Sequence, residues 1–441
     1  MSLRCQLAVS VGKLVRFMLR ILGRQASTLP GRVTLALHPK ALAQKAAACR
    51  IAAVTGTNGK TTTTALITNL LQAAGRPYHT NRFGANLASG LMTALLDAKA
   101  GDLAVLEVDE AALAACGQDL APAILVVTNL SPDQLDRFGS LTNIINLVEV
   151  GSQSAGELVL CLDDPHSRDI GAGKDWQKKT FFGLAERDRA NRAIATGAES
   201  GDQTAPAFSA KAPSDSRLVL YRREQIISTG ETCTACLHLT CRGLGEAWSD
   251  LQVKFPLPGA YNAANAAAAV AAASGLVPGL TATQIVGGLE TAKPQFGRLE
   301  RLTAGEHKIC LVLIKNEAGF KATAEMLSEQ ADLGGLIFVI NNNPADGEDI
   351  SWFSTAGAHR FLPGDIPYGA AGLCRKEVFQ ILAEELAERT DQPQLTCADE
   401  ADALPLVEAM LADLPPGKTL YVLPNYTAMM TLQPALQERF G

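Results

Sequence analysis

Short apolar runs alternate with longer stretches of helical periodicity along most of the chain. The runs expected to form strands are 51–54, 103–108, 124–128, 157–162, 309–314, 336–340 and 419–423. Strands that alternate with helices are typical of a parallel sheet covered by helices. The pattern therefore predicts an α/β protein whose sheets are mostly parallel.

Shifts in composition divide the chain into three parts. We expect an N-terminal helical and extended segment (1–47), a central domain (48–295) and a C-terminal α/β domain (296–441). Pro294 and Gly297 mark the linker between the last two. Within the central domain, 185–250 is polar with little periodicity, which predicts an insertion. Residues 260–273 are nearly all alanine and should form a closely packed helix.

The stretch 7–22 is typical of a basic amphipathic helix. Its apolar residues at helical spacing are Val11, Leu14, Val15, Met18 and Leu22. Lys13, Arg16 and Arg20 interrupt the run, so it suits neither a membrane span nor a signal-peptide core. The apolar face can rest on a membrane surface that carries a lipid-linked substrate, or it can pack on the protein's own body. We favour packing, which is the commoner use of such a helix.

Composition and charge narrow the class of protein. A chain of 441 residues, 47% hydrophobic and 19% charged, can bury a large core and should form two or three domains. The net charge of −6 does not suggest nucleic-acid binding. The ten cysteines are scattered, as is typical of reduced thiols in the cytoplasm. We expect a cytoplasmic protein without a nucleic-acid partner.

A glycine-rich segment joins the first predicted strand to a helical stretch. It reads Gly56, Thr57, Asn58, Gly59, Lys60, Thr61 and Thr62. The glycines let the backbone approach phosphate oxygens, the N–H groups of the turn point at the anion, and Lys60 adds positive charge. Thr61 is the candidate ligand of a magnesium ion. The general phosphate loop has a glycine where this chain has Val54, so this is a short form.

Acidic and amide residues follow several predicted strands. Glu107 ends one strand, and its carboxylate can hold magnesium opposite Thr61. Without the loop, a solvated acidic turn would be equally good. Thr128-Asn129 and Asp163-Asp164 close two more strands. Polar residues are thus expected at one sheet edge, where ligands bind in open α/β sheets.

Asn262 begins the alanine-rich stretch and is a candidate for recognising a base. Its amide offers both a donor and an acceptor to a purine edge, and Asn265 lies one turn later on the same helix face. Capping of the helix is the alternative use of Asn262.

The loop and the segment 258–265 resemble the Mur ligase superfamily, whose members use ATP to join an amine to a carboxylate through an acyl phosphate. Seven further segments are similar to the MurT family, the ligase subunits of lipid II isoglutaminyl synthase: 29–32, 81–87, 107–110, 133–137, 315–319, 346–352 and 425–428. The resemblance covers almost the whole chain. It implies a Mur ligase-like central domain that binds ATP and Mg²⁺, with Asn262 at the adenine and Arg298 at the terminal phosphate.

The resemblance also implies a reaction and a partner. The α-carboxyl of D-glutamate in the lipid II stem peptide would be activated by ATP and amidated to D-isoglutamine. Ammonia would come from a GatD-like glutaminase subunit in a heterodimer, and Asp349 would align the partner's catalytic histidine. Lys60, Arg298 and Asp349 are then the catalytic candidates. A loop carboxylate that caps a helix is the alternative for Asp349.

Members of this family commonly carry a four-cysteine zinc ribbon in the central domain. Here Cys233 and Cys236 remain, with Cys241 close by and no upstream cysteine pair. A tetrahedral thiolate site needs four ligands. We therefore expect no structural zinc, although these three cysteines with His238 leave an irregular site open.

Two other functions stay open. The chain could be another Mur or folylpolyglutamate-type ligase that adds an amino acid rather than ammonia. It could also be a nucleotide-binding scaffold subunit that has lost ligation. The presence of Lys60, Thr61, Glu107, Asn262 and Arg298 argues against the scaffold.

Overall fold

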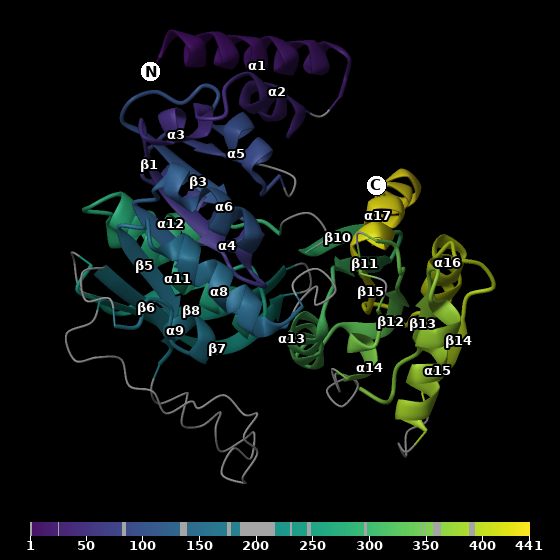
Figure 1. Ribbon diagram of the computed structural model, residues 1–441. Helices are drawn as coiled ribbons and strands as arrows, with labels where there is room; N and C mark the ends of the chain where they lie inside the picture. Colours follow the sequence, from purple (N-terminus) through teal and green to yellow (C-terminus); the bar gives the residue numbers. More distant parts are fainter. Residues whose placement is uncertain are drawn as a thin grey trace. The chain divides into compact units, whose positions relative to one another are not determined.

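The computed structural model describes residues 2–24, 26–81, 85–132, 139–173, 178–185, 217–229, 232–244, 248–294, 298–344, 346–347, 349–355, 363–387 and 393–441, with only the backbone for 225–229, 232–235 and 298. Two compact units are present. The first comprises Met1–Gln225, Ala235–Phe255 and Tyr261–Ala292; the second comprises Ile226–Thr234, Pro256–Ala260 and Lys293–Gly441. Each unit is built around its own sheet (Figure 1).

The first unit contains a nine-stranded sheet. In spatial order its strands are β2 (Tyr78–Thr80), β3 (Asp102–Glu107), β1 (Cys49–Thr55), β4 (Ile124–Val127), β5 (Glu157–Cys161), β6 (Lys178–Leu184), β7 (Arg217–Thr229), β8 (Thr232–Arg242) and β9 (Trp248–Phe255). The pairs from β2 to β7 are parallel, and β8 pairs with β9 antiparallel. The predicted α/β class with a mostly parallel sheet is confirmed.

Helices cover both faces of this sheet (Figure 1). One face carries α3 (Ala41–Ala46), α5 (Ala88–Ala94), α6 (Glu110–Leu120) and α8 (Leu141–Ser152), whose apolar residues share a core with Leu106 and Leu125. Ile124 points to the opposite face because side chains alternate along a strand. Gly275 of α11 (Ala260–Leu276) lies against it, and a Cβ at Gly275 would come within 2.6 Å of Ile124 Cδ1.

The alanine-rich α11 is buried along most of its length. Small side chains let it lie close to the sheet, as its composition predicted. On the same face, α12 (Ala282–Glu290) packs on β9 and on α4 (Lys60–Ala73), the helix that follows the glycine-rich loop. The short α9 (Pro165–Arg168) follows β5.

Residues 217–250 form the edge of the main sheet rather than an insertion outside it. β7 pairs with β6 in parallel register, and β8 and β9 continue the sheet. The expectation of a polar insertion over 185–250 is therefore corrected for this part, while 186–216 lie outside the described residues. Composition misled because β7 carries charged residues, among them Arg222 and Glu224, which weaken the apolar signal of the strand.

The first residues form a compact helical cap on the first unit. α1 (Leu3–Ile21) packs on α2 (Leu29–Leu37), which packs in turn on α5. A Cβ at Gly12 of α1 would lie 2.1 Å from the Thr34 hydroxyl of α2, so the two helices approach closely. No described helix is long and apolar enough to cross a membrane.

The second unit contains a six-stranded sheet. In spatial order its strands are β10 (Arg298–Ala304), β11 (His307–Val312), β15 (Thr419–Pro424), β12 (Leu333–Val339), β13 (Tyr368–Ala371) and β14 (Leu395–Cys397). Only β10 and β11 pair antiparallel. The last strand of the chain thus lies in the middle of this sheet.

Helices also cover the second sheet. They are α13 (Glu317–Ser328), α14 (Trp352–Thr355), α15 (Arg375–Leu386), α16 (Leu404–Ala412) and α17 (Tyr426–Phe440). α16 and α17 share an apolar core with Ile337 of β12. Phe338 points to the other face, where its ring lies 5.5 Å from that of Phe320 and 5.1 Å from that of Phe353. This aromatic cluster fixes α13 and α14 to the sheet.

Candidate functional site

The glycine-rich loop lies where β1 ends and α4 begins. Gly56 has φ 118° and Gly59 has φ 88°, a region that residues with side chains rarely adopt. A Cβ at Gly56 would lie 2.3 Å from the Thr128 hydroxyl, and one at Gly59 would lie 2.3 Å from Oδ1 of Asn265. Both glycines are therefore required by backbone conformation and by close approach.

The end of β4 holds the loop from one side. The Thr57 N–H donates to the Asn129 carbonyl (2.7 Å), and the Asn58 N–H donates to the Asn129 side-chain oxygen (3.1 Å). The Asn129 amide donates in return to the Asn58 carbonyl (2.9 Å), and the Thr128 hydroxyl donates to the same carbonyl (2.7 Å). The polar end of this strand was expected at the ligand edge, and here it shapes the loop itself.

Lys60 is the first residue of α4 and is largely enclosed by its neighbours. Its ammonium donates to the Gly56 carbonyl (2.5 Å) and pairs with the Glu110 carboxylate (3.0 Å). The Lys60 and Glu110 side chains are 13% and 6% exposed. Burial strengthens the electrostatic effect of a charge, so this lysine can act strongly on an anion in the loop. No pattern of neighbouring residues indicated that Glu110 would be its partner.

Thr61 and Glu107 lie side by side. The Thr61 hydroxyl donates to Oε2 of Glu107 (2.9 Å), and the Asn86 amide donates to Oε1 (3.2 Å). Asn81 accepts from the Glu107 N–H (2.9 Å) and donates to its carbonyl (2.8 Å), which fixes the end of β3. Hydroxyl and carboxylate oxygens are the ligands that Mg²⁺ prefers, so these residues fit that ion.

The strand order explains why these groups meet. After β1 the chain forms β2 and β3 on one side and then crosses to β4 on the other. The carboxyl ends of β3, β1 and β4 therefore converge where the direction of winding changes, which is the usual ligand position in such sheets. Ser131 follows β4, and its buried hydroxyl has no hydrogen-bond partner among the described residues. An anionic, oxygen-rich ligand suits this place.

The asparagines of α11 take different positions. Asn262 is 4% exposed in the first turn of the helix, and Asn265 is 6% exposed. The Thr63 hydroxyl donates to the Asn265 side chain (3.3 Å), and the same amide lies against Gly59. Asn265 thus supports the loop, a role that sequence spacing did not indicate. Thr62 is buried on α4.

Asp164 closes the same edge at the end of β5. Its carboxylate accepts from the N–H groups of Leu130 (2.5 Å), His166 (3.1 Å) and Ser167 (3.3 Å). Burial raises the pKa of this carboxyl, and the three hydrogen bonds only partly offset that effect. Asp164 therefore ties β4 to β5 and caps α9.

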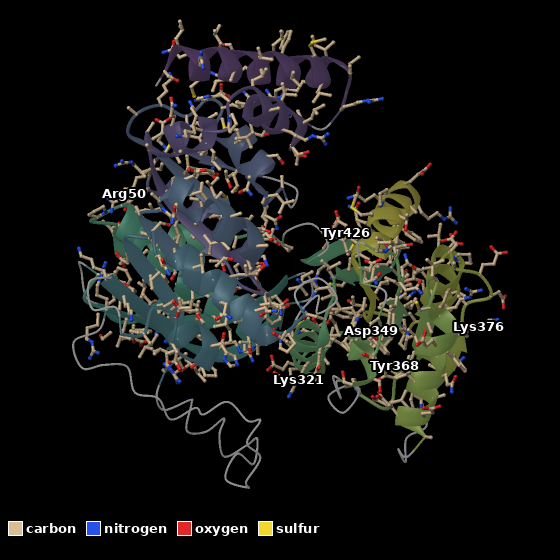
Figure 2. The ribbon with its side chains drawn as sticks, in the orientation of Figure 1. Arg50, Lys321, Asp349, Tyr368, Lys376 and Tyr426 are labelled. Carbon is tan, nitrogen blue, oxygen red and sulfur yellow. The ribbon has the colours of Figure 1, made fainter. Side chains whose placement is uncertain are left out.

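Two predicted catalytic residues belong to the second unit. Arg298 begins β10 and pairs with Val312, and its side chain lies outside the described part of the chain. Asp349 is exposed beside α14 (Figure 2). Its carboxylate accepts from the N–H (2.8 Å) and the hydroxyl (2.9 Å) of Ser351. These bonds hold the carboxylate at the surface, where a second protein can reach it.

A polar network marks the carboxyl ends of the central strands in the second unit. The Asn341 N–H donates to the Asn425 side chain (3.2 Å), which donates back to the Asn341 carbonyl (2.6 Å). The amides of Asn341 and Asn343 donate to the Thr427 hydroxyl, and Asp346 accepts from the Thr427 N–H (2.8 Å). Of this network, segments 346–352 and 425–428 had been singled out by resemblance, but Asn341 and Asn343 had not.

The cysteine segment is organised around a histidine. His238 is 6% exposed; its Nδ1 lies 2.6 Å from Asp250 and its Nε2 lies 3.1 Å from Glu224 and 3.6 Å from the Cys236 sulfur. No group of three His, Cys, Asp or Glu side chains that could hold a metal occurs in the described residues. The Cys233 side chain lies outside them. Cys241 is buried, which raises its pKa to about 11.

Three further predicted segments cannot be placed. Residues 82–84, 133–138 and 295–297 lie outside the described residues, and the resembling motifs at 81–87 and 133–137 and the linker glycine fall wholly or partly on them. What remains is a site on the first unit with an enclosed lysine, a hydroxyl–carboxylate pair and a glycine loop. Such a site can bind a nucleoside triphosphate with a divalent cation.

Two family profiles match the chain. The Mur ligase middle domain matches residues 54–273, and the MurT ligase C-terminal family matches residues 313–429. Together they span the loop site and most of the second unit.

The chain is similar to curated proteins over its full length. It is 29% identical to the lipid II isoglutaminyl synthase (glutamine-hydrolyzing) subunit MurT of Streptococcus pneumoniae, over 100% of this chain and 98% of that protein. It is 27% identical to the subunit of the same name from Staphylococcus aureus strain N315, over 98% of each chain.

Solved structures share the fold. A MurF structure from Acinetobacter baumannii superposes with a TM-score of 0.67 at 19% identity, covering 92% of this chain and 80% of that one. A MurF ligase from Thermotoga maritima in complex with ADP gives a TM-score of 0.64 at 17% identity, covering 92% and 83%. At these identities the likeness shows the fold alone.

Proposed function

Since this chain belongs to the Mur ligase family of ATP-dependent ligases, we propose that it is the ligase subunit of a lipid II isoglutaminyl synthase. The observation that carries the proposal is the full-length similarity to MurT subunits, combined with the enclosed Lys60 beside the Thr61–Glu107 pair. A protein that bound no nucleotide would not need to keep a buried lysine and a hydroxyl–carboxylate pair at a phosphate loop, and the similarity to ligase subunits favours ligation over a nucleotide-binding scaffold.

The proposed reaction amidates the α-carboxyl of D-glutamate in the lipid II stem peptide. A carboxylate oxygen attacks the γ-phosphorus of ATP, which gives an acyl phosphate and ADP. Ammonia then attacks the acyl carbon, phosphate leaves, and the nitrogen loses a proton, so the product is D-isoglutamine. No covalent bond to the enzyme is required. The role of the protein is to position the reactants and to offset the charge that develops.

We assign to Lys60 the role of offsetting negative charge in the first step. Its ammonium is held 2.5 Å from the Gly56 carbonyl, inside the loop whose N–H groups would donate hydrogen bonds to phosphate oxygens. Negative charge that develops on the transferred phosphoryl group would be offset by this ammonium. Glu110 pairs with the ammonium and orients it when no nucleotide competes for it.

Thr61 and Glu107 are the residues we assign to Mg²⁺. A bound magnesium ion neutralises phosphate charge and polarises the group that is transferred. Asn86 and Asn81 hold the Glu107 carboxylate and backbone, so the ligand would be oriented before the ion arrives. In the same proposal Asn262 contacts the adenine, and Arg298 contacts the terminal phosphate.

The source of ammonia is proposed to be a GatD-like glutaminase subunit that forms a heterodimer with this chain. The relatives named glutamine-hydrolyzing subunits support a partner, because a subunit name implies a complex. We propose that the C-terminal domain, 296–441, carries the surface that binds the partner. There Asp349 would orient the catalytic histidine of the partner. The central domain, 48–295, would bind ATP. The substrate is lipid-linked, so the complex would work in the cytoplasm at the inner face of the membrane.

The test is ATP-dependent amidation of lipid II, followed by the mass of the stem peptide. We expect a product in which an amino group replaces a hydroxyl, formed with glutamine plus the partner or with ammonium alone. Lys60→Ala should form none. An amino-acid-adding ligase would give a product heavier by a residue. A scaffold would bind ATP and give no product.

A further inference from the structure

The outer face of α1 is apolar and open. Eight apolar residues lie on this face, mostly three or four positions apart, and the last four form two adjacent pairs. We call them the α1 stripe: Leu3, Leu7, Val11, Leu14, Phe17, Met18, Ile21 and Leu22. Every one of these side chains belongs to an exposed residue, and the exposed fraction reaches 72% at Leu3. Figure 2 shows side chains of α1 pointing away from α2 along the length of the helix. Apolar surface of this extent usually marks a contact with something else.

The opposite face of α1 is already used. Cys5, Ala8, Val9 and Gly12 are buried, and the helix packs on α2 and α3. Lys13 and Arg16 both pair with Asp97, in the segment between α5 and β3. The helix is therefore fixed on the unit, and the α1 stripe cannot turn inward to cover itself.

Basic residues prevail around the α1 stripe, and the nearby Asp97 is already paired with Lys13 and Arg16. The first 96 residues contain twelve lysines and arginines and no aspartate or glutamate, although the whole chain has a net charge of −6. Arg4, Arg20 and Arg24 have exposed side chains that form no ion pair or hydrogen bond within the described structure. Arg4 and Arg20 project at the two borders of the stripe, and Arg24 follows the helix. The net charge of the whole chain conceals this asymmetry.

We propose that α1 lies in the headgroup region of an anionic lipid bilayer, with the α1 stripe toward the acyl chains and Arg4, Arg20 and Arg24 at the lipid phosphates. An apolar face bordered by basic residues is the pattern of helices that rest in the membrane interface. The proposal deepens the proposed function, because it names the surface that brings the chain to a lipid-linked substrate. Membrane binding itself needs no turnover.

Other occupants fit less well. A second copy of the chain would bring two α1 helices together, and arginines would meet arginines because α1 contains no acidic residue to pair with them. A nucleic acid would be attracted by the charge, but the eight apolar side chains would lie unused between the basic ones. Anionic lipid satisfies both parts of the surface.

The test is sedimentation of the full-length chain with vesicles of phosphatidylcholine, with or without phosphatidylglycerol. We expect binding to the anionic vesicles, weakened at least about tenfold by Leu14→Glu/Met18→Glu. Changing Arg4, Arg20 and Arg24 to glutamine should weaken binding about fivefold per arginine and remove most of its salt dependence. Phe17→Trp should show blue-shifted fluorescence that brominated lipids quench.

The matched control is Val150→Glu/Met430→Glu. These side chains are 53% and 51% exposed, close to the 57% of Leu14 and the 54% of Met18, and they lie on other helices. The control should bind vesicles as the wild type does. Circular dichroism checks that all variants fold.

Three results would overturn the proposal: equal binding by the stripe variant and the control, equal binding to neutral vesicles, or a dimer in solution that the stripe variant dissolves. Amidation of a water-soluble stem-peptide analogue separates this inference from the proposed function. If the stripe variant amidates the analogue normally but loses vesicle binding, both proposals stand. Vesicle binding without any amidation would reject the proposed function alone.

Discussion

The Thr61 hydroxyl donates a 2.9 Å hydrogen bond to Oε2 of Glu107, which joins the first turn of α4 to the end of β3. These residues are 46 positions apart in the chain. The parallel pairing of β1 with β3 places Val54 opposite Glu107, so the loop that follows β1 reaches the carboxylate directly. The pair is thus a product of sheet register and not of local sequence.

Removing the charge of Glu107 should impair the use of magnesium. We expect Glu107→Gln to lower the amidation rate about 100-fold and to raise the Mg²⁺ concentration needed for half-maximal rate. Asn86→Ala should raise that concentration by about tenfold, because it removes the donor that orients the carboxylate. A Mg²⁺ titration of the rate measures both effects. Glu290→Gln, an exposed carboxylate on α12, serves as the control and should change neither quantity.

The Lys60–Glu110 ion pair should couple stability to activity. Lys60→Ala leaves the Glu110 carboxylate buried without its partner, which should cost about 3 kcal/mol of unfolding free energy. The double variant Lys60→Met/Glu110→Gln removes both charges and should unfold close to the wild-type temperature. Neither variant should amidate or gain thermal stability from ATP. A double variant as unstable as Lys60→Ala would contradict the assigned pairing.

Gly59 and Asn265 should show strong coupling. Gly59→Ala forces a Cβ to within 2.3 Å of the Asn265 side chain at φ 88°, so we expect ATP to bind at least about tenfold more weakly. Adding Asn265→Ala removes the clash and should restore about 1 kcal/mol of that loss, measured by nucleotide titration in a double-mutant cycle.

Gly75→Ala is the matched control for this cycle. Gly75 follows the same helix with φ 66°, and nothing lies within 4 Å of a Cβ there. The substitution should cost about 1 kcal/mol of stability through backbone strain and leave ATP affinity unchanged. Equal loss of affinity at both glycines would show that strain, and not the Asn265 contact, controls the loop.

Local sequence was enough to predict the loop and the strand that feeds it. The loop's glycines and Lys60 lie within a few residues of each other, and their roles depend on backbone geometry that neighbours impose. Glu107 was also predicted, because carboxyl ends of parallel strands share an edge. Glu110 and Asn265 were not predicted as partners of the loop. Their contacts depend on the turn after β3 and on how α11 packs, which no local pattern specifies.

The fold shows the same division. Strands buried on both faces, such as β4 and β5, are continuous apolar runs, and the sequence predicted them. β9 at the edge of the first sheet was missed, since it alternates buried with exposed positions. β13 is only Tyr368–Ala371, and glycine and alanine carry little strand signal. Such strands form because a partner strand offers hydrogen bonds.

The ion pairs of Asp97 with α1 should stabilise the protein near neutral pH and lose this effect in acid. Burial opposes the charge of Asp97, but hydrogen bonds from Lys13 and Arg16 outweigh it, so the pKa of this carboxyl lies below its ordinary value of 3.8. The stabilisation is therefore present above the pKa of the unfolded chain and is lost as pH falls through the lower folded value. It should amount to about 1 kcal/mol or less, because the Asp97 side chain is half exposed.

The measurement for Asp97 compares thermal unfolding of the wild type and Asp97→Asn. Near neutral pH the variant should unfold a few degrees lower, and the difference should shrink as the pH falls below the ordinary value of 3.8 and the wild-type carboxylate gains a proton. Asp102→Asn is the comparison variant. Asp102 pairs with His79 and not with α1, so its substitution leaves the ion pairs of α1 in place. A difference that grows in acid would reject the assigned sign.

Asp349 should matter for glutamine as nitrogen source but not for ammonium. Its exposed carboxylate is held by two hydrogen bonds from Ser351, and the next turn is anchored by Phe353, whose ring stacks 4.9 Å from Phe320. If this carboxylate orients a histidine of the partner, Asp349→Asn should lower glutamine-dependent amidation about 100-fold or more. Ammonium bypasses the glutaminase, so that rate should change by less than about twofold. Asp413→Asn, an exposed aspartate on the same unit, should affect neither rate. Equal losses with both nitrogen sources would place Asp349 in ligation or in folding instead of at the partner.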